Sequence, residues 1–173
     1  NPRQRIVDII GRPLSFYLGL KGQALRQRVA ELLEMIELDP ALYMDRQPRE
    51  LSGGQKQRIC IARALAAEPQ LIICDEVTSA LDQLVAEGVL KLLNRIQQQL
   101  GVAYLFITHD VATVRAIADE VLVMQRGKVV DHGCREEIFT PPYRDYTGLL
   151  FSSEPEMDPD WLDHLLEKRA LVS

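Results

Sequence analysis

A serine and two glycines open a helical pattern in this chain, and a strand-like run that ends in two carboxylates follows soon after. Residues 51–55 read Leu-Ser-Gly-Gly-Gln and lead into a helical stretch at residues 57–67. Glycines leave a loop without side chains, so backbone N–H groups at the positive end of the helix can approach an anion closely. This segment therefore predicts a phosphate-binding loop that opens onto a helix.

The apolar run at residues 71–74 follows Pro69 and has the composition of a strand that is buried on both faces. Asp75 and Glu76 come directly after it. Open α/β sheets bind ligands at the carboxyl ends of their strands, and neighbouring residues on a strand point to opposite sides. We therefore expect different roles for the two carboxylates, one facing a hydrated Mg²⁺ and the other facing a water molecule to be activated.

Each motif alone has an ordinary explanation, because Ser-Gly-Gly is commonly a turn before a helix and Asp-Glu is commonly a solvated loop start. Their order adds information. Ser-Ala-Leu-Asp follows at residues 79–82, and Thr-His-Asp follows at residues 108–110 after a second apolar run at residues 102–107. Together these motifs resemble the nucleotide-binding domain of ATP-binding cassette (ABC) proteins. The resemblance covers nearly all of residues 1–140.

The resemblance implies a role for each motif residue. Residues 51–55 correspond to the ABC signature, which in the family contacts the γ-phosphate of ATP held by the opposite subunit of a dimer. Ser52, Gly53 and Gly54 would make that contact, and Gln55 belongs to the same nucleotide-binding motif. Asp75 would orient Mg²⁺ through its water shell, as the Walker B aspartate does. Glu76 would be the general base that polarises the attacking water.

Two further residues complete the implied site. His109 corresponds to the switch histidine that reaches the γ-phosphate, and Asp82 corresponds to the D-loop residue that couples the two sites across the dimer. A histidine after a strand is more often an ordinary loop residue, but the position of His109 in Ile-Thr-His-Asp favours the functional role. Asp110 is expected to cap the following helix and so to hold His109 near the sheet edge.

The phosphate-cradling Walker A motif, Gly-x-x-x-x-Gly-Lys followed by Ser or Thr, is absent from these 173 residues. The family's Q-loop glutamine would stand just before Asn1. We therefore expect the chain to be the C-terminal part of a longer ABC-type ATPase. The intact parent would be the enzyme, and this part alone is predicted to be inactive.

The hydrophobic periodicities predict an α/β fold. With the resemblance, the expected fold class is a P-loop NTPase-like (RecA-like) parallel sheet core, truncated at its N-terminus, with an α-helical signature subdomain. The expected divisions are residues 1–68 for the helical subdomain, 69–140 for the C-terminal part of the core, and 141–173 for the tail. Helices are expected at residues 6–10, 24–38, 85–100 and 111–118, and strands at 71–74, 102–107, 120–124 and 128–131.

Composition limits the classes of partner. With a net charge of −5 and no long basic run, the chain has no electrostatic footprint for direct nucleic acid binding. The apolar runs are shorter than the roughly 20 residues that cross a bilayer, so membrane contact is expected only through partner subunits. Cys60, Cys74 and Cys134 show no C-x-x-C spacing and are expected to be buried thiols. A cytoplasmic location on the inner face of the cell membrane is expected.

The two ends of the chain narrow the resemblance to importers of the oligopeptide, dipeptide and nickel group. Asn-Pro-Arg at residues 1–3 and Glu-Ile-Phe at residues 137–139 match that group, whereas Arg144-Asp145 replaces its usual His-Pro and leaves the solute open. The resemblance implies ATP and Mg²⁺ as cofactors, a second cassette as partner, and permease subunits that contact the helical subdomain. Two alternatives remain: a non-transport ABC ATPase of DNA repair or ribosomes, or a catalytically silent half of a fused pair.

The absence of the Walker A motif gives the first testable prediction. Isothermal titration of the 173-residue chain with ATP and Mg²⁺ is expected to show no saturable binding, because the missing loop carries most of the ground-state grip on nucleotide. Micromolar affinity would contradict this expectation.

Overall fold

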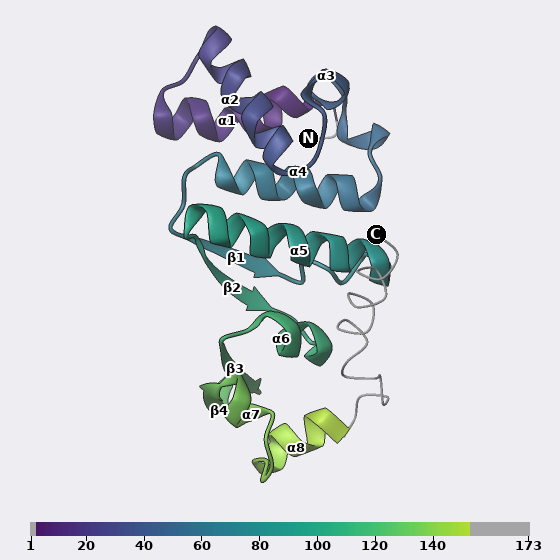
Figure 1. Cartoon of the computed structure of the whole chain (residues 1–173), viewed down its shortest axis with the longest axis vertical. Coiled ribbons are helices and arrows are strands. Elements are labelled where there is room, and N and C mark those ends of the chain that lie inside the picture. Colours follow the sequence, from purple (N-terminus) through teal and green to yellow (C-terminus); the bar gives the residue numbers. More distant parts are fainter. Residues whose placement is uncertain (1–2, 153–173) are drawn as a thin grey trace, which may run out of the picture. The chain divides into compact units, whose positions relative to one another are not determined.

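The computed structural model describes residues 3–152, which divide into two compact units, one up to Ile107 and one from Thr108 onward. The first unit contains α1 (Ile6–Leu18), α2 (Gly22–Met35), α3 (Pro40–Tyr43), the short 3₁₀ helix η1 (Pro48–Glu50), α4 (Gly53–Leu65), β1 (Leu71–Asp75), α5 (Gln83–Leu100) and β2 (Ala103–Ile107) (Figure 1). The second contains α6 (Val111–Ile117), β3 (Glu120–Gln125), β4 (Lys128–Cys134), α7 (Arg135–Ile138) and α8 (Asp145–Ser152).

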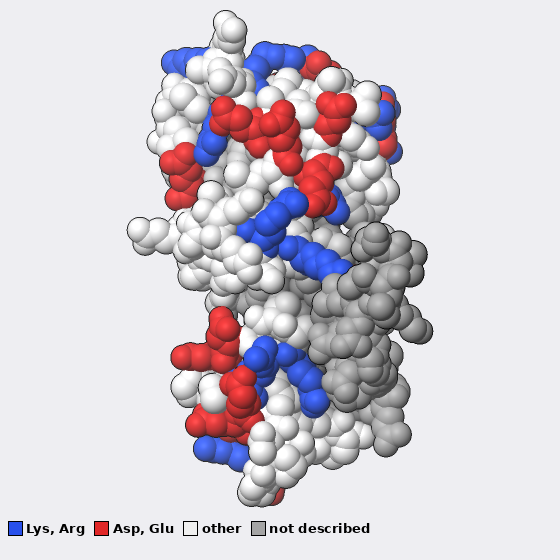
Figure 2. Space-filling view, viewed as in Figure 1, with Lys and Arg blue, Asp and Glu red and all other residues white. Residues whose placement is uncertain are grey.

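The core of the first unit lies between its long helices. Figure 1 shows α5 between α4 on one side and the two strands on the other. Exposed ion pairs include Arg5–Asp45, between the cap of α1 and the segment after α3, and Arg28–Glu31 within α2. Figure 2 shows acidic and basic groups side by side on the surface of this unit. The buried side chains of this core include Ile6, Ile10 and Leu14 of α1, Val29, Leu32 and Leu33 of α2, Ile59 and Ala62 of α4, and Val89, Leu92, Leu93 and Ile96 of α5.

The two strands of the first unit are parallel, with register from Leu71 opposite Ala103 to Asp75 opposite Ile107. The crossover between them is α5, so the predicted βαβ unit is confirmed. One face of the pair, with Tyr104 and Phe106, packs on the helical core. The opposite face leaves four large apolar side chains exposed: Leu71, Ile73, Leu105 and Ile107. The prediction that β1 is buried on both faces is therefore wrong for this structure, because the described helices of the unit cover one face only.

Helix ends differ from the predicted limits. The helix expected to run to residue 38 ends at Met35, because Glu37 takes a left-handed backbone conformation (φ 62°) before the expected stop at residues 39–40 is reached. The helix expected at residues 6–10 continues to Leu18. In α4, Gly53 is already helical, so the signature glycines form the first turn of the helix rather than the loop that was predicted.

The second unit contains a helix and a hairpin that agree with the sequence. Asp110 caps α6 as predicted, and its carboxylate accepts hydrogen bonds from the N–H of Ala112 (3.1 Å) and the hydroxyl of Thr113. β3 and β4 pair antiparallel around Arg126 (φ 50°) and Gly127 (φ 76°), whose positive φ values suit a two-residue hairpin turn.

Buried Asp131 attaches α8 to β4 in this unit. Its carboxylate accepts hydrogen bonds from the Thr147 hydroxyl (2.6 Å) and pairs with Nε of Arg144 (3.1 Å). The sequence also suggests that an amphipathic helix docks on the core through Trp161, Leu162, Leu165 and Leu166, and these four residues lie outside the described residues. The predicted boundaries after residues 68 and 140 stay predictions.

Candidate functional site

Ser52 forms the start of α4. Its hydroxyl accepts a hydrogen bond from the N–H of Gln55 (3.3 Å), and the Gln55 side-chain oxygen accepts one from the N–H of Ser52 (3.0 Å). This reciprocal capping box satisfies two N–H groups that helix geometry would leave without acceptors. The side-chain amide nitrogen of Gln55 donates to the hydroxyl of Tyr43 (2.9 Å). Gln55 therefore supports the helix start, while Ser52 and Gly53 stay exposed.

The start of α4 lies directly against the start of α5. A Cβ atom on Gly54 would lie 2.5 Å from Cγ1 of Val85, and one on Gly53 would lie 3.5 Å from Leu81. Further along, Gly88 lies near the guanidinium of Arg58. Because residues later in α4 contact residues later in α5, the two helices run in the same direction, with their N-terminal ends together. Only glycine at position 54 permits this separation.

Asp82 is the cap of α5. Its carboxylate accepts a hydrogen bond from the N–H of Val85 (3.0 Å), and the residue is exposed. The Gly54–Val85 contact thus brings the capping residues Ser52 and Asp82 to the same end of a parallel helix pair. Two motifs that are about thirty residues apart in the chain become one surface of positive helix ends.

Asp75 and Glu76 occupy different kinds of backbone. Asp75 is the last residue of β1 and lies on its exposed face. Glu76 has left the strand: its φ is 46°, its N–H donates to the carbonyl of Ile107 (2.8 Å), and its carbonyl accepts from the Ser79 hydroxyl (3.0 Å). Because Glu76 is no longer part of the strand, strand alternation does not determine where its carboxylate lies relative to that of Asp75.

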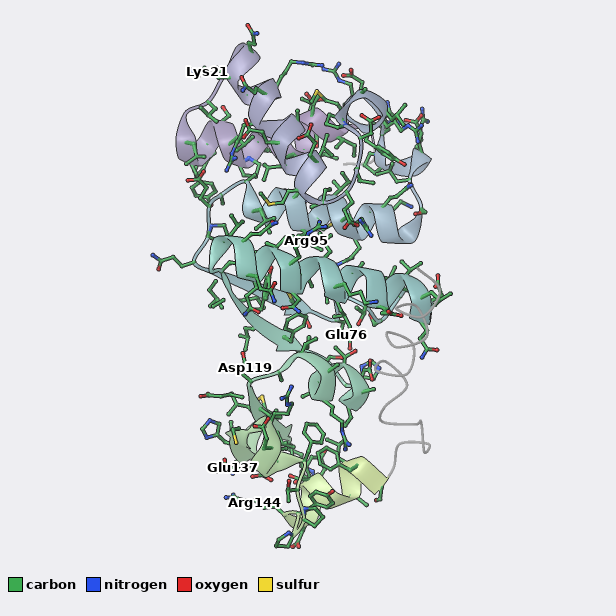
Figure 3. All side chains as sticks on the ribbon, viewed as in Figure 1. Lys21, Glu76, Arg95, Asp119, Glu137 and Arg144 are labelled. Carbon is green, nitrogen blue, oxygen red and sulfur yellow. The ribbon has the colours of Figure 1, made fainter. Side chains whose placement is uncertain are left out.

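The Glu76 conformation has a cost. A non-glycine residue in the left-handed region costs of order 1–3 kcal/mol and is found often at functional sites. Figure 3 shows Glu76 beyond the end of β1. The exposed carboxylate at the open end of a parallel strand pair fits a group that meets a ligand at the sheet edge.

His109 belongs to the second unit and is exposed. The N–H of Asp110 donates to the Thr108 hydroxyl (3.1 Å), and Asp110 caps α6, so the backbone on the C-terminal side of His109 is fixed. His109 follows the end of β2 by two residues, while Glu76 follows β1. Its approach to the γ-phosphate stays a prediction.

The metal-binding capacity of the described chain is small. Residues 3–152 contain no group of three or more His, Cys, Asp or Glu side chains that could hold a metal ion. Mg²⁺ usually keeps several waters and binds through one or two carboxylates together with substrate phosphates. A single exposed carboxylate such as Asp75 fits that mode. The thiol before it, Cys74, is buried, and burial raises its pKa to about 11, which makes it an inert core group.

A groove between α1 and α4 is a second candidate site, which the sequence did not reveal. It has a volume of about 690 Å³, an apolar floor that includes Ile9 and Ile59, and exposed Phe16 and Tyr17 at one end. Cys60 also lines it and is exposed, and Cys134 is only partly buried, so the prediction of three buried thiols is right for Cys74 alone. The adjacent aromatic pair at residues 16–17 was the available signal. Its basic lining residues are Arg12, Lys56 and Arg63.

The family model described as ABC transporter matches residues 2–79. Over these residues the chain is therefore similar to the ABC transporter family. The resemblance predicted from residues 51–55 and from the carboxylate strand is thereby confirmed.

Curated ABC relatives cover nearly the whole chain. The dipeptide transport ATP-binding protein DppF of Haemophilus influenzae is 41% identical over 160 residues, which is 92% of this chain and 49% of that protein. The oligopeptide transport ATP-binding protein OppF of Escherichia coli K12 is 45% identical over 161 residues, or 92% of this chain and 48% of that protein. The chain therefore spans about half the length of these relatives.

Solved ABC structures confirm the fold class. The dimeric, ADP- and phosphate-bound cassette MJ0796 superposes with a TM-score of 0.67 and 33% identity, covering 78% of this chain and 58% of that one. An inward-facing putative metal-chelate type ABC transporter gives a TM-score of 0.69 and 32% identity, covering 79% and 55%. The chain thus has part of the P-loop NTPase fold of ABC cassettes. The roles of its individual site residues stay predictions.

The α4–α5 contact gives a second testable prediction. Gly54→Ala is expected to lower the free energy of unfolding in urea by about 1–3 kcal/mol, because the new methyl group overlaps stiff, β-branched Val85. The matched change Gly53→Ala has room, so it should be neutral or stabilising by up to about 1 kcal/mol. Equal costs for the two changes would contradict the close approach. A Val85→Ala background should remove most of the Gly54→Ala cost.

Proposed function

We propose that this chain carries the signature and Walker B part of the ATP-hydrolysing subunit of an ABC importer, which couples ATP hydrolysis to uptake of peptides or a related small solute. The observation that carries the proposal is that one compact unit has both an exposed, capped helix start at Ser52 and an exposed carboxylate at the end of β1. Relatives at 41–45% identity are named as peptide importer ATP-binding proteins.

In the proposed mechanism, the start of α4 binds the γ-phosphate of ATP that the opposite cassette holds. The first N–H groups of a helix have no acceptor within it, and in α4 the Ser52 hydroxyl takes that of Gln55. The N–H groups of Gly53 and Gly54, with no side chain before them, can then approach phosphate oxygens. Phosphoryl transfer gains mostly from such positioning and charge stabilisation.

The remaining residues act at the sheet edge. Mg²⁺ would supply charge neutralisation at the phosphates, and Asp75 would hold its water shell in place. Glu76, which follows the strand in a left-handed turn, accepts the proton of the attacking water on a carboxylate oxygen. His109 contacts the γ-phosphate, and Asp82 couples the two sites of the dimer.

The groove between α1 and α4 is the proposed contact with the permease subunits. Its apolar floor and exposed aromatic pair suit an amphipathic helical segment, and its basic lining suits a segment with acidic groups. Residues 3–152 contain no helix that is long and apolar enough to cross a membrane. The proposed location is therefore the cytoplasmic face of the cell membrane, through these partners.

The general base assignment gives a third testable prediction. In the intact ATPase, Glu76→Gln is expected to lower kcat by about 10²–10⁴, the usual contribution of a positioned base, while ATP-driven dimerisation is kept. The matched control is Glu68→Gln, an exposed glutamate that also has a left-handed backbone (φ 49°). An unchanged steady-state rate in Glu76→Gln would remove the residue from this role and would favour a silent half-site.

The groove assignment gives a fourth testable prediction. Phe16→Ala is expected to reduce recovery of the permease subunits in co-purification by at least about tenfold, because an aromatic anchor at an interface commonly contributes about 2 kcal/mol or more. Leu42→Ala on α3 removes another exposed apolar side chain outside the groove and should leave recovery unchanged. Recovery that is insensitive to Phe16 would contradict the groove as the contact.

A further inference from the structure

Two backbone hydrogen bonds close the turn that ends α2. The N–H of Leu38 donates to the carbonyl of Leu33 (2.9 Å), and the N–H of Glu37 donates to the carbonyl of Glu34 (2.9 Å). This pair of bonds is the Schellman motif, which requires a left-handed residue at the Glu37 position. The motif leaves the last two carbonyls of the helix, those of residues 35 and 36, still in need of donors.

Two arginines from two other helices supply these donors. Arg95 of α5 donates from Nη2 to the carbonyl of Met35 (2.9 Å), and Arg58 of α4 donates from Nη1 to the carbonyl of Ile36 (3.0 Å). Both guanidinium groups also pair with the carboxylate of Glu37, Arg95 at 2.7 Å and Arg58 at its other oxygen. We name Glu37, Arg58 and Arg95 the clasp. Figure 3 labels Arg95 between α5 and α4, and Figure 2 shows acidic and basic groups side by side on the surface of this unit.

Glu37 holds its place against a backbone preference. Its φ is 62°, a conformation in which glycine is the usual residue at a helix end. Glycine would relieve the strain, yet this chain has a glutamate there. The Arg58 hydrogen bond holds the pKa of the Glu37 carboxyl below its usual range, with both arginine charges adding to the effect. An ionised carboxylate between two cations is therefore the normal state of this position.

The clasp is a second connection between the two helices of the candidate site. The first is apolar: the Gly54–Val85 contact at their N-terminal ends and the buried side chains that the two helices share, such as Ile59 and Val89. Arg58 lies one turn further along α4, and Arg95 lies near the end of α5. A link through Glu37 at this second position adds a directional, polar constraint on the angle between the helices, which apolar packing alone specifies less tightly.

We propose that Glu37 is a positioning residue for ATP hydrolysis: by joining Arg58 of α4 to Arg95 of α5, it sets the angle at which α4 presents Ser52 to the nucleotide. The inference rests on the proposed function, because the rate that it controls is that of ATP hydrolysis. Glu37 does not touch the nucleotide in this account. It also links the end of α2, whose buried side chains form part of the helical core, to α4, which carries the signature.

The test compares two left-handed glutamates in the intact ATPase assembled with its membrane subunits. Glu37→Gly removes the carboxylate and relieves the backbone strain at the same time. The two effects on stability oppose each other, so a loss of kcat in this variant reports on positioning. We expect kcat to fall by at least about fivefold, as small misplacements of a reacting group do, with KM for ATP changed by less than about twofold. The thermal midpoint should stay within about 2 °C of the wild type or rise.

The control Glu68→Gly has the same backbone relief, at φ 49°, but its side chain pairs with Arg28 of α2 and not with the clasp. It should keep the wild-type kcat. Glu37→Gln, which retains a neutral acceptor for the two arginines, should lie between the wild type and Glu37→Gly. A wild-type kcat in Glu37→Gly, or a loss of kcat matched by an equal loss in Glu68→Gly, would overturn the inference.

Amide hydrogen exchange distinguishes failure of the inference from failure of the proposed function. In the 173-residue chain, exchange at the N–H groups of Gln55 and Lys56 should be faster by at least about threefold in Glu37→Gly than in Glu68→Gly. If the intact wild-type protein lacks ATPase activity while the two variants differ in exchange in this way, the proposed function is refuted and the clasp is supported. Equal exchange in the two variants would overturn the clasp whatever the activity.

Discussion

The close approach of α4 and α5 at Gly54 is the contact on which the candidate site depends. A methyl group at that position would overlap Val85, so only glycine lets the two helix starts meet. Because they meet, Ser52 and Asp82 lie at one end of a parallel pair, where two positive helix ends face the same way. The signature glycine therefore has a packing reason for its identity, in addition to any contact with phosphate.

Three residues in the implied site or next to it are helix caps. Ser52 caps α4, Asp82 caps α5 and Asp110 caps α6 beside His109. A cap fixes the backbone at the point where a helix begins, which is also where N–H groups and positive potential are available to an anion. The same side chains thus stabilise the fold and place the groups that are proposed to act on ATP.

Local patterns were enough to predict the elements around the site. The apolar runs at β1 and β2 and the periodic stretch between them predicted the parallel βαβ unit, and Asp110 was correctly predicted as a cap. Tertiary features were not predictable in the same way. The left-handed backbone of Glu76, the exposed face of β1 and the arginines that close the end of α2 depend on contacts between distant segments. No local pattern carries those contacts, since each partner alone reads as an ordinary surface residue.

The most direct test of the account is a structure of the intact Glu76→Gln ATPase with ATP and Mg²⁺ bound. The account predicts that the Ser52 hydroxyl and the N–H of Gly54 lie within about 3.2 Å of γ-phosphate oxygens on a nucleotide held by the opposite cassette. It also predicts that α4 and α5 keep the Gly54–Val85 contact seen here. A nucleotide-bound dimer in which the start of α4 faces solvent, away from any phosphate, would contradict the central claim.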